Sequence, residues 1–172
     1  MAAPTSKAVA DTELDGSGLT VAVVTARWNA GICAALREGA RRAIARAGAD
    51  VVDASAPGAF ELPFAAKVLA ERDDVDAVVV IGCVIRGETT HYELVSEGCA
   101  TGVMSVQLET GVPIGLGVAT VESPDQALAR AQGPGGHNVG EDAAAAAIEM
   151  ALLARTRGCR GDAASPNVPR TS

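Results

Sequence analysis

The sequence predicts a single-domain α/β fold in which a four-stranded parallel sheet carries helices on both faces. Short runs of apolar residues alternate along the chain with segments of helical period, which is typical of consecutive βαβ units. Glycine and proline mark the boundaries between these segments. The length of 172 residues suits one domain, and alanine and valine supply most of the 48% hydrophobic fraction.

Four apolar segments predict the strands. The strongest is the run at residues 77–85, which ends abruptly in Arg86 and Gly87. The others are residues 19–25, residues 51–54, which Pro57 and Gly58 close, and residues 114–120. Each run is short and bounded by turn residues, which favours a strand over a buried helix.

Five segments between and after the strands predict helices. In residues 32–47 the apolar side chains recur on one helical face, and Gly48 ends the pattern. Ser123 is predicted as an N-cap with Pro124 at the first helical position. The remaining helices are expected at residues 61–71, 90–110 and 141–157, with the Ser123 helix reaching residue 131. The order of elements predicts a three-layer sandwich of flavodoxin-like topology.

The two ends of the chain differ from this pattern. Residues 1–18 are polar and aperiodic, and residues 158–172 are rich in glycine, proline and serine. We expect a flexible N-terminal arm at 1–18, the folded domain at 19–157 and a flexible tail at 158–172. No secretory signal is visible at the start of the chain.

Composition excludes several classes of protein. A net charge of −7 and a pI near 4.8 argue against a nucleic-acid surface, and no apolar run is long enough to cross a membrane. The four cysteines are scattered without a C-x-x-C pair, which predicts free buried thiols in a reducing cytoplasm. We therefore expect a cytoplasmic protein with no nucleic-acid or membrane partner.

Residues 84–93 predict an anion site beside a proton-transfer group. A strand, a glycine turn and a helix start follow one another there, and unpaired N–H groups at a helix N-terminus attract anions. Thr90 and Glu93 fit a capping box, with Thr90 as the N-cap and His91 as the first helical residue. The positive end of the helix disfavours the imidazolium form and helps keep His91 a neutral base.

Other unusual residues follow the other strands. In a parallel sheet, the strand ends at residues 25–29, 57–61, 83–91 and 120–122 share one edge, where such folds bind ligands. Trp28, Phe60 and Tyr92 lie at strand-to-helix junctions, which favours a flat aromatic or heterocyclic ligand.

Several common sites are missing from the sequence. The loop at residues 133–140 lacks the Lys-Ser/Thr of a nucleotide-binding P-loop, and no G-x-G-x-x-G follows the first strand. No cluster has metal-ligand spacing, and no serine triad is apparent. A lone histidine or a lone arginine such as Arg130 is more often structural, but the neighbouring Arg86 to Thr89 segment would place an anion beside His91.

Taken together, the strand-end motifs resemble those of the lumazine synthase family. The resemblance covers about residues 19–155. The matching stretches, in the order found in the family, are Arg27-Trp28-Asn29, Pro57-Gly58-Ala59-Phe60-Glu61-Leu62-Pro63, Gly82 to Tyr92, Gly111-Val112-Pro113, Gln126 to Ala131, and Ala147-Ile148-Glu149-Met150.

The resemblance implies a reaction and a set of residues. The family condenses 5-amino-6-(D-ribitylamino)uracil with 3,4-dihydroxy-2-butanone 4-phosphate, without metal or redox cofactor, to give 6,7-dimethyl-8-ribityllumazine, phosphate and water. His91 would transfer protons. The ribitylaminouracil would be held by Trp28, Ala59, Phe60, Glu61, Cys83, Val84, Ile85 and Leu116. The phosphate would be held by Glu88, Thr89 and Arg130.

The resemblance also implies an assembly. Members form pentamers with active sites between adjacent subunits, and some form sixty-subunit cages. Many bacterial members carry a lysine after the Arg130 position, whereas this chain has none after Lys67, and its longer loop is more similar to that of pentameric members. We expect a homopentamer. Two alternatives remain from the sequence: a non-catalytic flavin or lumazine binder, and a scaffold protein of the same fold.

Overall fold

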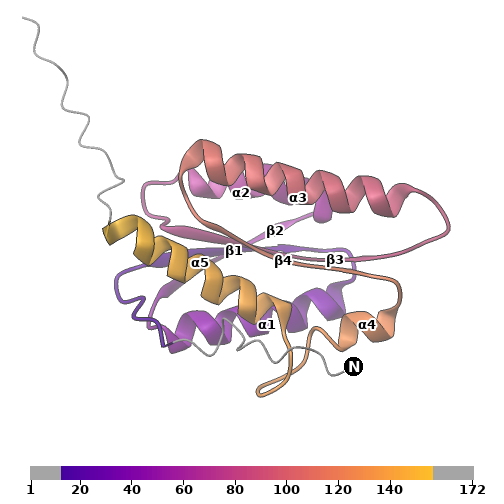
Figure 1. Cartoon of the computed structure of the whole chain (residues 1–172), viewed down its shortest axis with the longest axis horizontal. Coiled ribbons are helices and arrows are strands. Elements are labelled where there is room, and N and C mark those ends of the chain that lie inside the picture. Colours follow the sequence, from indigo (N-terminus) through magenta and orange to yellow (C-terminus); the bar gives the residue numbers. More distant parts are fainter. Residues whose placement is uncertain (1–12, 157–172) are drawn as a thin grey trace, which may run out of the picture.

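A computed structural model describes residues 13–156 as a three-layer α/β sandwich (Figure 1). The four strands are all parallel in the order β2-β1-β3-β4, which confirms the predicted flavodoxin-like fold. They are β1 (Thr20–Ala26), β2 (Asp50–Ala56), β3 (Ala77–Ile85) and β4 (Ile114–Val121).

The described residues include little of the predicted chain ends. Outside them lie most of the predicted arm at 1–18, the predicted tail at 158–172 and Cys159. The described end of the arm contacts the domain, since the Gly16 N–H donates to the Ala47 carbonyl at 2.8 Å.

Helices cover both faces of the sheet. The helices are α1 (Ala30–Arg46), a 3₁₀ turn η2 (Ala59–Glu61), α2 (Leu62–Ala70), α3 (His91–Thr110), α4 (Pro124–Leu128) and α5 (Val139–Thr156). In Figure 1, α2 and α3 lie on one face of the sheet, and α1, α4 and α5 lie on the other. All the predicted helices are present, with ends that differ by a few residues.

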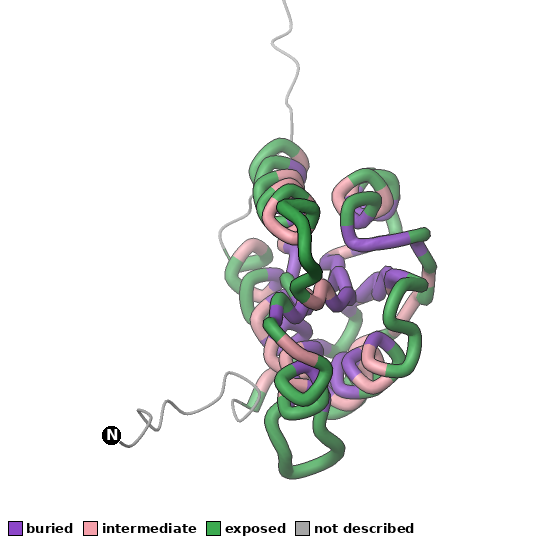
Figure 2. The backbone as a smooth tube through the Cα atoms, turned by 90° about the vertical axis from the view of Figure 1, so that its right-hand side faces the viewer, coloured by how far each residue is buried: buried purple, intermediate pink, exposed green. Residues whose placement is uncertain are grey.

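Alternation along the strands divides the core in two. In β3, Val79 and Ile81 pack toward α1 and α5, whereas Val78 and Val80 pack toward α2 and α3. All four are fully buried because β3 lies inside the sheet, and the buried residues accordingly gather in the middle layer (Figure 2). This is why the sequence of β3 is continuously apolar rather than alternating.

The strand order creates a switch point between β1 and β3. From β1 the chain moves outward to β2, then returns to β3 on the other side of β1 and continues to β4. The pairing of β1 with β3 stops at Thr25 and Ile81, but β3 continues along β4 as far as Ile85. The end of β3 therefore projects beyond β1, and such a position is where open α/β sheets bind ligands.

Both predicted N-cap positions are confirmed, but only one of the two side chains caps its helix. Ser123 caps α4, with its Oγ accepting from the Gln126 N–H at 3.3 Å. Thr90 is the residue before α3, but its side chain makes no cap hydrogen bond. The predicted capping box does not form because the Glu93 carboxylate binds Arg86 instead. The first backbone donors of α3 are left without the partner that Thr90 would have provided.

Small residues let α1 and α5 approach closely. A methyl group added at Gly140 would lie 2.1 Å from the Leu36 carbonyl oxygen, so only glycine fits there. Asn138, which is 3% exposed, joins the two helices: its amide nitrogen donates to the Ala35 carbonyl at 3.0 Å, and its oxygen accepts from the Gly140 N–H at 3.0 Å. A buried amide with its polar atoms paired fixes this contact.

Replacing Gly140 with alanine is expected to destabilise the fold by about 1–3 kcal/mol, because the new methyl group forces α5 away from the α1 backbone. Chemical denaturation of the Gly140→Ala protein measures the change. The matched control is Gly31→Ala, also near the start of a helix, where nothing lies within 4 Å of the added methyl group. Equal stability of the Gly140→Ala and Gly31→Ala proteins would contradict the packing argument.

Candidate active site

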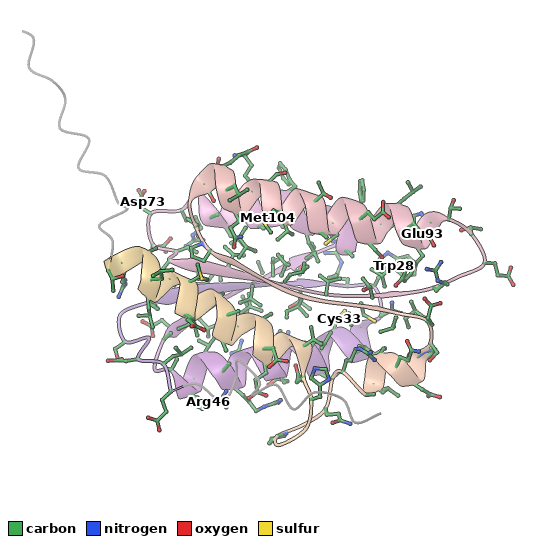
Figure 3. All side chains as sticks on the ribbon, in the orientation of Figure 1. Trp28, Cys33, Arg46, Asp73, Glu93 and Met104 are labelled. Atoms are coloured by element: carbon green, nitrogen blue, oxygen red, sulfur yellow. The ribbon has the colours of Figure 1, made fainter. Side chains whose placement is uncertain are left out.

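A cleft of about 590 Å³ lies at the carboxyl ends of the strands, at the switch between β1 and β3. Figure 3 shows Trp28 and Glu93 at this end of the molecule and Asp73 at the opposite end. The cleft has the size of a site for a small heterocyclic ligand. Four segments that are distant in sequence form its wall, namely the turn after β1, the turn η2, the end of β3 and the first turns of α3.

The structure brings together most of the residues that the sequence nominated. Eight of the predicted site residues line the cleft: Trp28, Ala59, Phe60, Glu61, Cys83, Val84, Ile85 and His91. The other four, Glu88, Thr89, Leu116 and Arg130, are not among its lining residues. The cleft of a single chain therefore contains the residues predicted for the ring and the ribityl chain except Leu116, and it leaves out the predicted phosphate ligands.

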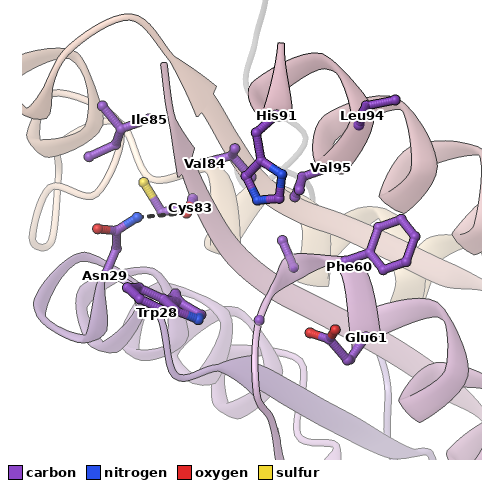
Figure 4. A pocket seen from close by; sticks show the side chains of 12 residues that line it. Trp28, Asn29, Phe60, Glu61, Cys83, Val84, Ile85, His91, Leu94 and Val95 are labelled. Carbon is purple, nitrogen blue, oxygen red and sulfur yellow. Dashed lines mark hydrogen bonds between the residues drawn. The ribbon is translucent and has the colours of Figure 1, made fainter. Parts of the chain in front are cut away.

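The turn after β1 carries Trp28 and is held by its neighbour, Asn29. Asn29 is the only non-glycine residue with a positive φ, 55°, in the described part of the chain. Its amide nitrogen donates to the Cys83 carbonyl at 2.9 Å, tying the end of β1 to the end of β3 (Figure 4). Trp28 itself is 74% exposed, so its indole presents a broad apolar face to the cleft.

The turn η2 supplies the opposite wall. Phe60 is 60% exposed, and its ring lies against α3 at Gly98, where an added methyl group would come within 2.9 Å of the ring. Glu61 follows at the start of α2 and places a carboxylate at the cleft (Figure 4). An aromatic ring and a carboxylate side by side suit a ligand that has both a flat ring and hydroxyl groups.

The end of β3 contributes backbone and the thiol of Cys83, which lies near the Cys33 thiol of α1. Beyond Ile81, β1 offers no pairing partner, so residues 82–85 turn one side of their backbone toward the cleft. Burial raises the pKa of the Cys33 thiol to about 12, and the nearby Cys83 adds to that effect. Burial also raises the pKa of the Cys83 thiol. Both thiols stay protonated near neutral pH, which excludes a thiolate nucleophile at this position.

The start of α3 brings His91 to the cleft. Its imidazole points into the space bordered by Trp28 and Phe60 (Figure 4). Leu94 and Val95 lie one helical turn further on and line the same wall. None of the described residues that line the cleft is a lysine or an arginine. The cleft of the single chain therefore contains an imidazole but no cation for a phosphate.

The four remaining nominated residues lie around the cleft or away from it. Glu88 and Thr89 are exposed in the turn before α3, where the Thr89 hydroxyl accepts from the His91 N–H at a long 3.4 Å. Leu116 is exposed on β4, an edge strand of the sheet. Arg130 follows α4, and its guanidinium donates to the Gln126 carbonyl at 3.0 Å. Arg130 has no carboxylate partner among the ion pairs of residues 13–156.

Four lining residues were not nominated from the sequence: Asn29, Gly58, Leu94 and Val95. Asn29 could have been found, because asparagine at a strand-to-helix turn often takes the left-handed conformation. Gly58 could not, because its role depends on a close contact: an added methyl group would lie 3.1 Å from the Trp28 ring. Leu94 and Val95 follow from His91 by helical spacing.

Large apolar side chains are exposed on the side of the molecule that α2 and α3 cover. They are Phe60, Phe64, Val68, Leu94, Met104 and Leu108, of which Phe64 is 75% and Leu108 76% exposed. Several large exposed apolar side chains on these two neighbouring helices favour an interaction surface.

The described residues contain neither a membrane-spanning helix nor a metal-binding cluster. In residues 13–156, no helix is long and apolar enough to cross a membrane. Within the same range, no group of three or more His, Cys, Asp or Glu side chains could hold a metal ion.

Comparison with known proteins gives consistent matches over most of the chain. The family model described as 6,7-dimethyl-8-ribityllumazine synthase matches residues 18–155. A 6,7-dimethyl-8-ribityllumazine synthase of Thermus thermophilus is 47% identical over 143 residues, which cover 81% of this chain and 90% of that protein. The one from Xanthomonas euvesicatoria is 47% identical over 135 residues, covering 77% and 87%. The one from Xanthomonas campestris is 48% identical over 134 residues, covering 76% and 86%.

Two substitutions at Asn29 separate its conformation from its hydrogen bond. Asn29→Gly keeps the left-handed turn but loses the bond to Cys83, and is expected to cost about 1 kcal/mol of stability. Asn29→Ala loses the bond and strains the backbone, and is expected to cost about 1–2 kcal/mol more. Denaturation of both proteins measures the difference. An alanine protein as stable as the glycine protein would show that the left-handed turn imposes no constraint.

Proposed function

The chain belongs to the 6,7-dimethyl-8-ribityllumazine synthase family, whose reaction it catalyses in riboflavin synthesis, and we propose that the cleft at the ends of β1, β2 and β3 is where it does so. The reaction joins 5-amino-6-(D-ribitylamino)uracil to 3,4-dihydroxy-2-butanone 4-phosphate and releases phosphate and water. The observation that carries this location is the meeting of Trp28, Phe60, the projecting end of β3 and His91 around one cavity.

The ribitylaminouracil ring would lie between apolar walls and be recognised by backbone. Trp28 offers a flat face for stacking, and the segment Cys83 to Ile85 offers peptide groups that β1 leaves unpaired. Peptide N–H and C=O groups match the alternating donors and acceptors of a uracil edge. Ala59, Phe60 and Glu61 would hold the ribityl chain, with the Glu61 carboxylate accepting from its hydroxyl groups.

The butanone phosphate would bind at the turn that precedes α3. Thr90 makes no cap hydrogen bond, and the His91 N–H has only the long 3.4 Å contact with the Thr89 hydroxyl, so the first N–H groups of α3 can bind an anion. Glu88 and Thr89 would contribute backbone N–H groups and Thr89 its hydroxyl, with the Glu88 carboxylate turned toward solvent. The leaving phosphate would then lie within one helical turn of His91.

His91 would transfer the protons of the condensation. The substrate supplies its own amine, so formation of the imine, loss of phosphate and ring closure require proton transfer rather than an enzyme nucleophile. Holding the two substrates next to each other supplies a large part of the acceleration. His91 has the required position because it starts α3 and its ring enters the cleft.

A neighbouring subunit would complete the site. The cleft of one chain contains no lysine or arginine, whereas the departing phosphate requires positive charge. We infer that Arg130 and Leu116 enter the site of an adjacent subunit, with Arg130 binding the phosphate and Leu116 facing the uracil. The exposed apolar surface of α2 and α3 supports such an assembly, and we propose a homopentamer.

We also propose a cytoplasmic location. The cysteines that the structure describes, Cys33, Cys83 and Cys99, are free thiols, which a reducing compartment favours.

The activity is tested by mixing the purified protein with both substrates and following lumazine formation by absorbance. A rate above the spontaneous condensation is expected. Tight binding of lumazine or riboflavin without turnover would instead indicate a non-catalytic binder, and neither turnover nor binding would indicate a scaffold. Native mass spectrometry tests the assembly, since a mass near five chains is expected and one near sixty would contradict it.

His91→Ala is expected to lower kcat by about 10²–10⁴-fold, because the proton-transfer group is removed while the positions of both substrates remain. Steady-state kinetics measures the change. Circular dichroism and native mass spectrometry serve as controls that the fold and assembly persist. Unchanged kcat in a correctly assembled His91→Ala protein would refute its role.

Arg130→Ala is expected to raise the KM for the phosphorylated substrate about tenfold or more with a smaller effect on the KM for the uracil, because a charged hydrogen bond to phosphate is lost.

Co-assembly of two variants tests whether adjacent subunits share each site. When His91→Ala and Arg130→Ala chains are mixed equally, about a quarter of the sites in a random ring combine an intact His91 with an intact Arg130. Recovery of low-KM activity in the mixed oligomer is expected, and its absence would contradict a shared site.

A further inference from the structure

Arg86 lies directly between the predicted phosphate turn and the end of the sheet, and its side chain contacts two carboxylates and an aromatic ring. Its backbone N–H donates to the Val121 carbonyl at 2.9 Å, continuing the pairing of β3 with β4. Its guanidinium binds the Glu93 carboxylate on α3 and lies 2.8 Å from a carboxylate oxygen of Glu122, after β4. It also stacks on Tyr92 with 4.1 Å to the ring centroid.

These contacts leave little of the positive charge of Arg86 available to a ligand. Two carboxylates share one guanidinium, so the cluster of Arg86, Glu93 and Glu122 is negative overall. Hydrogen bonding to Arg86 holds the pKa of Glu93 below its usual value, which keeps that carboxylate ionised near neutral pH. The sequence expectation that Arg86 helps to place an anion beside His91 is therefore at odds with the contacts that its side chain makes.

The first turns of α3 need an external anchor. The first fully buried residue of α3 is Cys99, more than two turns after His91. Tyr92 and Glu93, which flank His91 on its helical side, are only partly buried, and both contact Arg86. Val95, one turn after His91, is only partly buried but packs against the core, so the start of α3 is held both by this packing and by the contacts of Tyr92 and Glu93 with Arg86.

We propose that Arg86 is a positioning residue for His91 and not a phosphate ligand, because its guanidinium clamps the start of α3 to the end of β4. The proposal rests on the proposed role of His91 in proton transfer. Arginine suits this task because its planar fork binds two carboxylates at once while one face stacks on an aromatic ring. A displacement of about 1 Å at a catalytic group can cost about 10²-fold in rate, so a clamp of modest stability has a large effect on turnover.

Two conservative substitutions distinguish a clamp from a phosphate ligand. Arg86→Lys keeps the charge but removes the fork and the stacking, and Glu122→Gln keeps the shape but removes one anchoring charge. If Arg86 is a clamp, both variants lower kcat, by about 10-fold to 100-fold for Arg86→Lys and less for Glu122→Gln, and leave the KM for the phosphorylated substrate within about threefold. If Arg86 is a phosphate ligand, Arg86→Lys raises this KM and Glu122→Gln lowers it, and the proposal is overturned.

Arg72 provides the matched control. It forms a two-pronged ion pair with Asp74, at 2.9 and 2.7 Å, in the segment before β3, at the other end of that strand from the cleft. Arg72→Lys removes a comparable fork without touching α3, so kcat should stay at the wild-type value. Non-additive effects in the double variant of Arg86→Lys and Glu122→Gln are also expected, since both changes break one cluster.

A measurement that does not require turnover completes the test. The chain has 2 histidines, so a His137→Gln background leaves only the His91 imidazole to be followed by NMR. In this background the His91 signal should shift or broaden in the Arg86→Lys and Glu122→Gln proteins but not with Arg72→Lys. An unchanged signal together with an unchanged kcat overturns the clamp. Failure of the wild-type protein to turn over would reject the proposed function instead, and the NMR comparison would still decide whether Arg86 positions His91.

Discussion

The unequal length of two neighbouring strands is the constraint on which the site depends. β3 pairs with β1 only as far as Ile81 but follows β4 to Ile85, so its last residues have a strand on one side and the cleft on the other. In the interior of a sheet, peptide groups without a partner are costly unless water or a ligand satisfies them. We propose that this exposed backbone recognises the ligand; the Asn29 amide already binds one of its carbonyl groups, that of Cys83.

The close contact between α1 and α5 supports this geometry from the other side of the sheet. Glycines at positions 39 and 140 allow the helices to approach, and Asn138 satisfies the buried polar groups between them. The same asparagine holds the loop after Arg130, because its amide also donates to the Gln132 carbonyl at 3.0 Å. Packing behind the sheet is thereby connected to the segment that we propose enters a neighbouring site.

Charge in the site is distributed in an unexpected way. The chain has a net charge of −7, and the arginine nearest the phosphate turn is bound by two carboxylates. A helix N-terminus without a side-chain cap can still attract an anion. In the assembly that we propose, the missing positive charge would come from a neighbouring subunit, because a phosphate bound between subunits would meet Arg130 of one and the α3 N-terminus of the other. Assembly and catalysis would depend on the same arginine.

The sequence by itself determined the layers of the fold, all four strands and most of the cleft. Apolar runs and helical periods are set by residues that lie close together in the sequence. Because parallel strands bring their ends to one edge of the sheet, the sequence also predicts that Trp28, Phe60 and His91 lie close together. Only the tertiary structure decided which partner each polar side chain takes. Thr90 and Glu93 match a capping box locally. In the structure, however, the Glu93 carboxylate binds the Arg86 guanidinium, which also binds Glu122 after β4. Which partner Arg86 binds depends on its distance from residues such as Glu122 that are far away in the sequence. A local sequence motif carries no information about that distance.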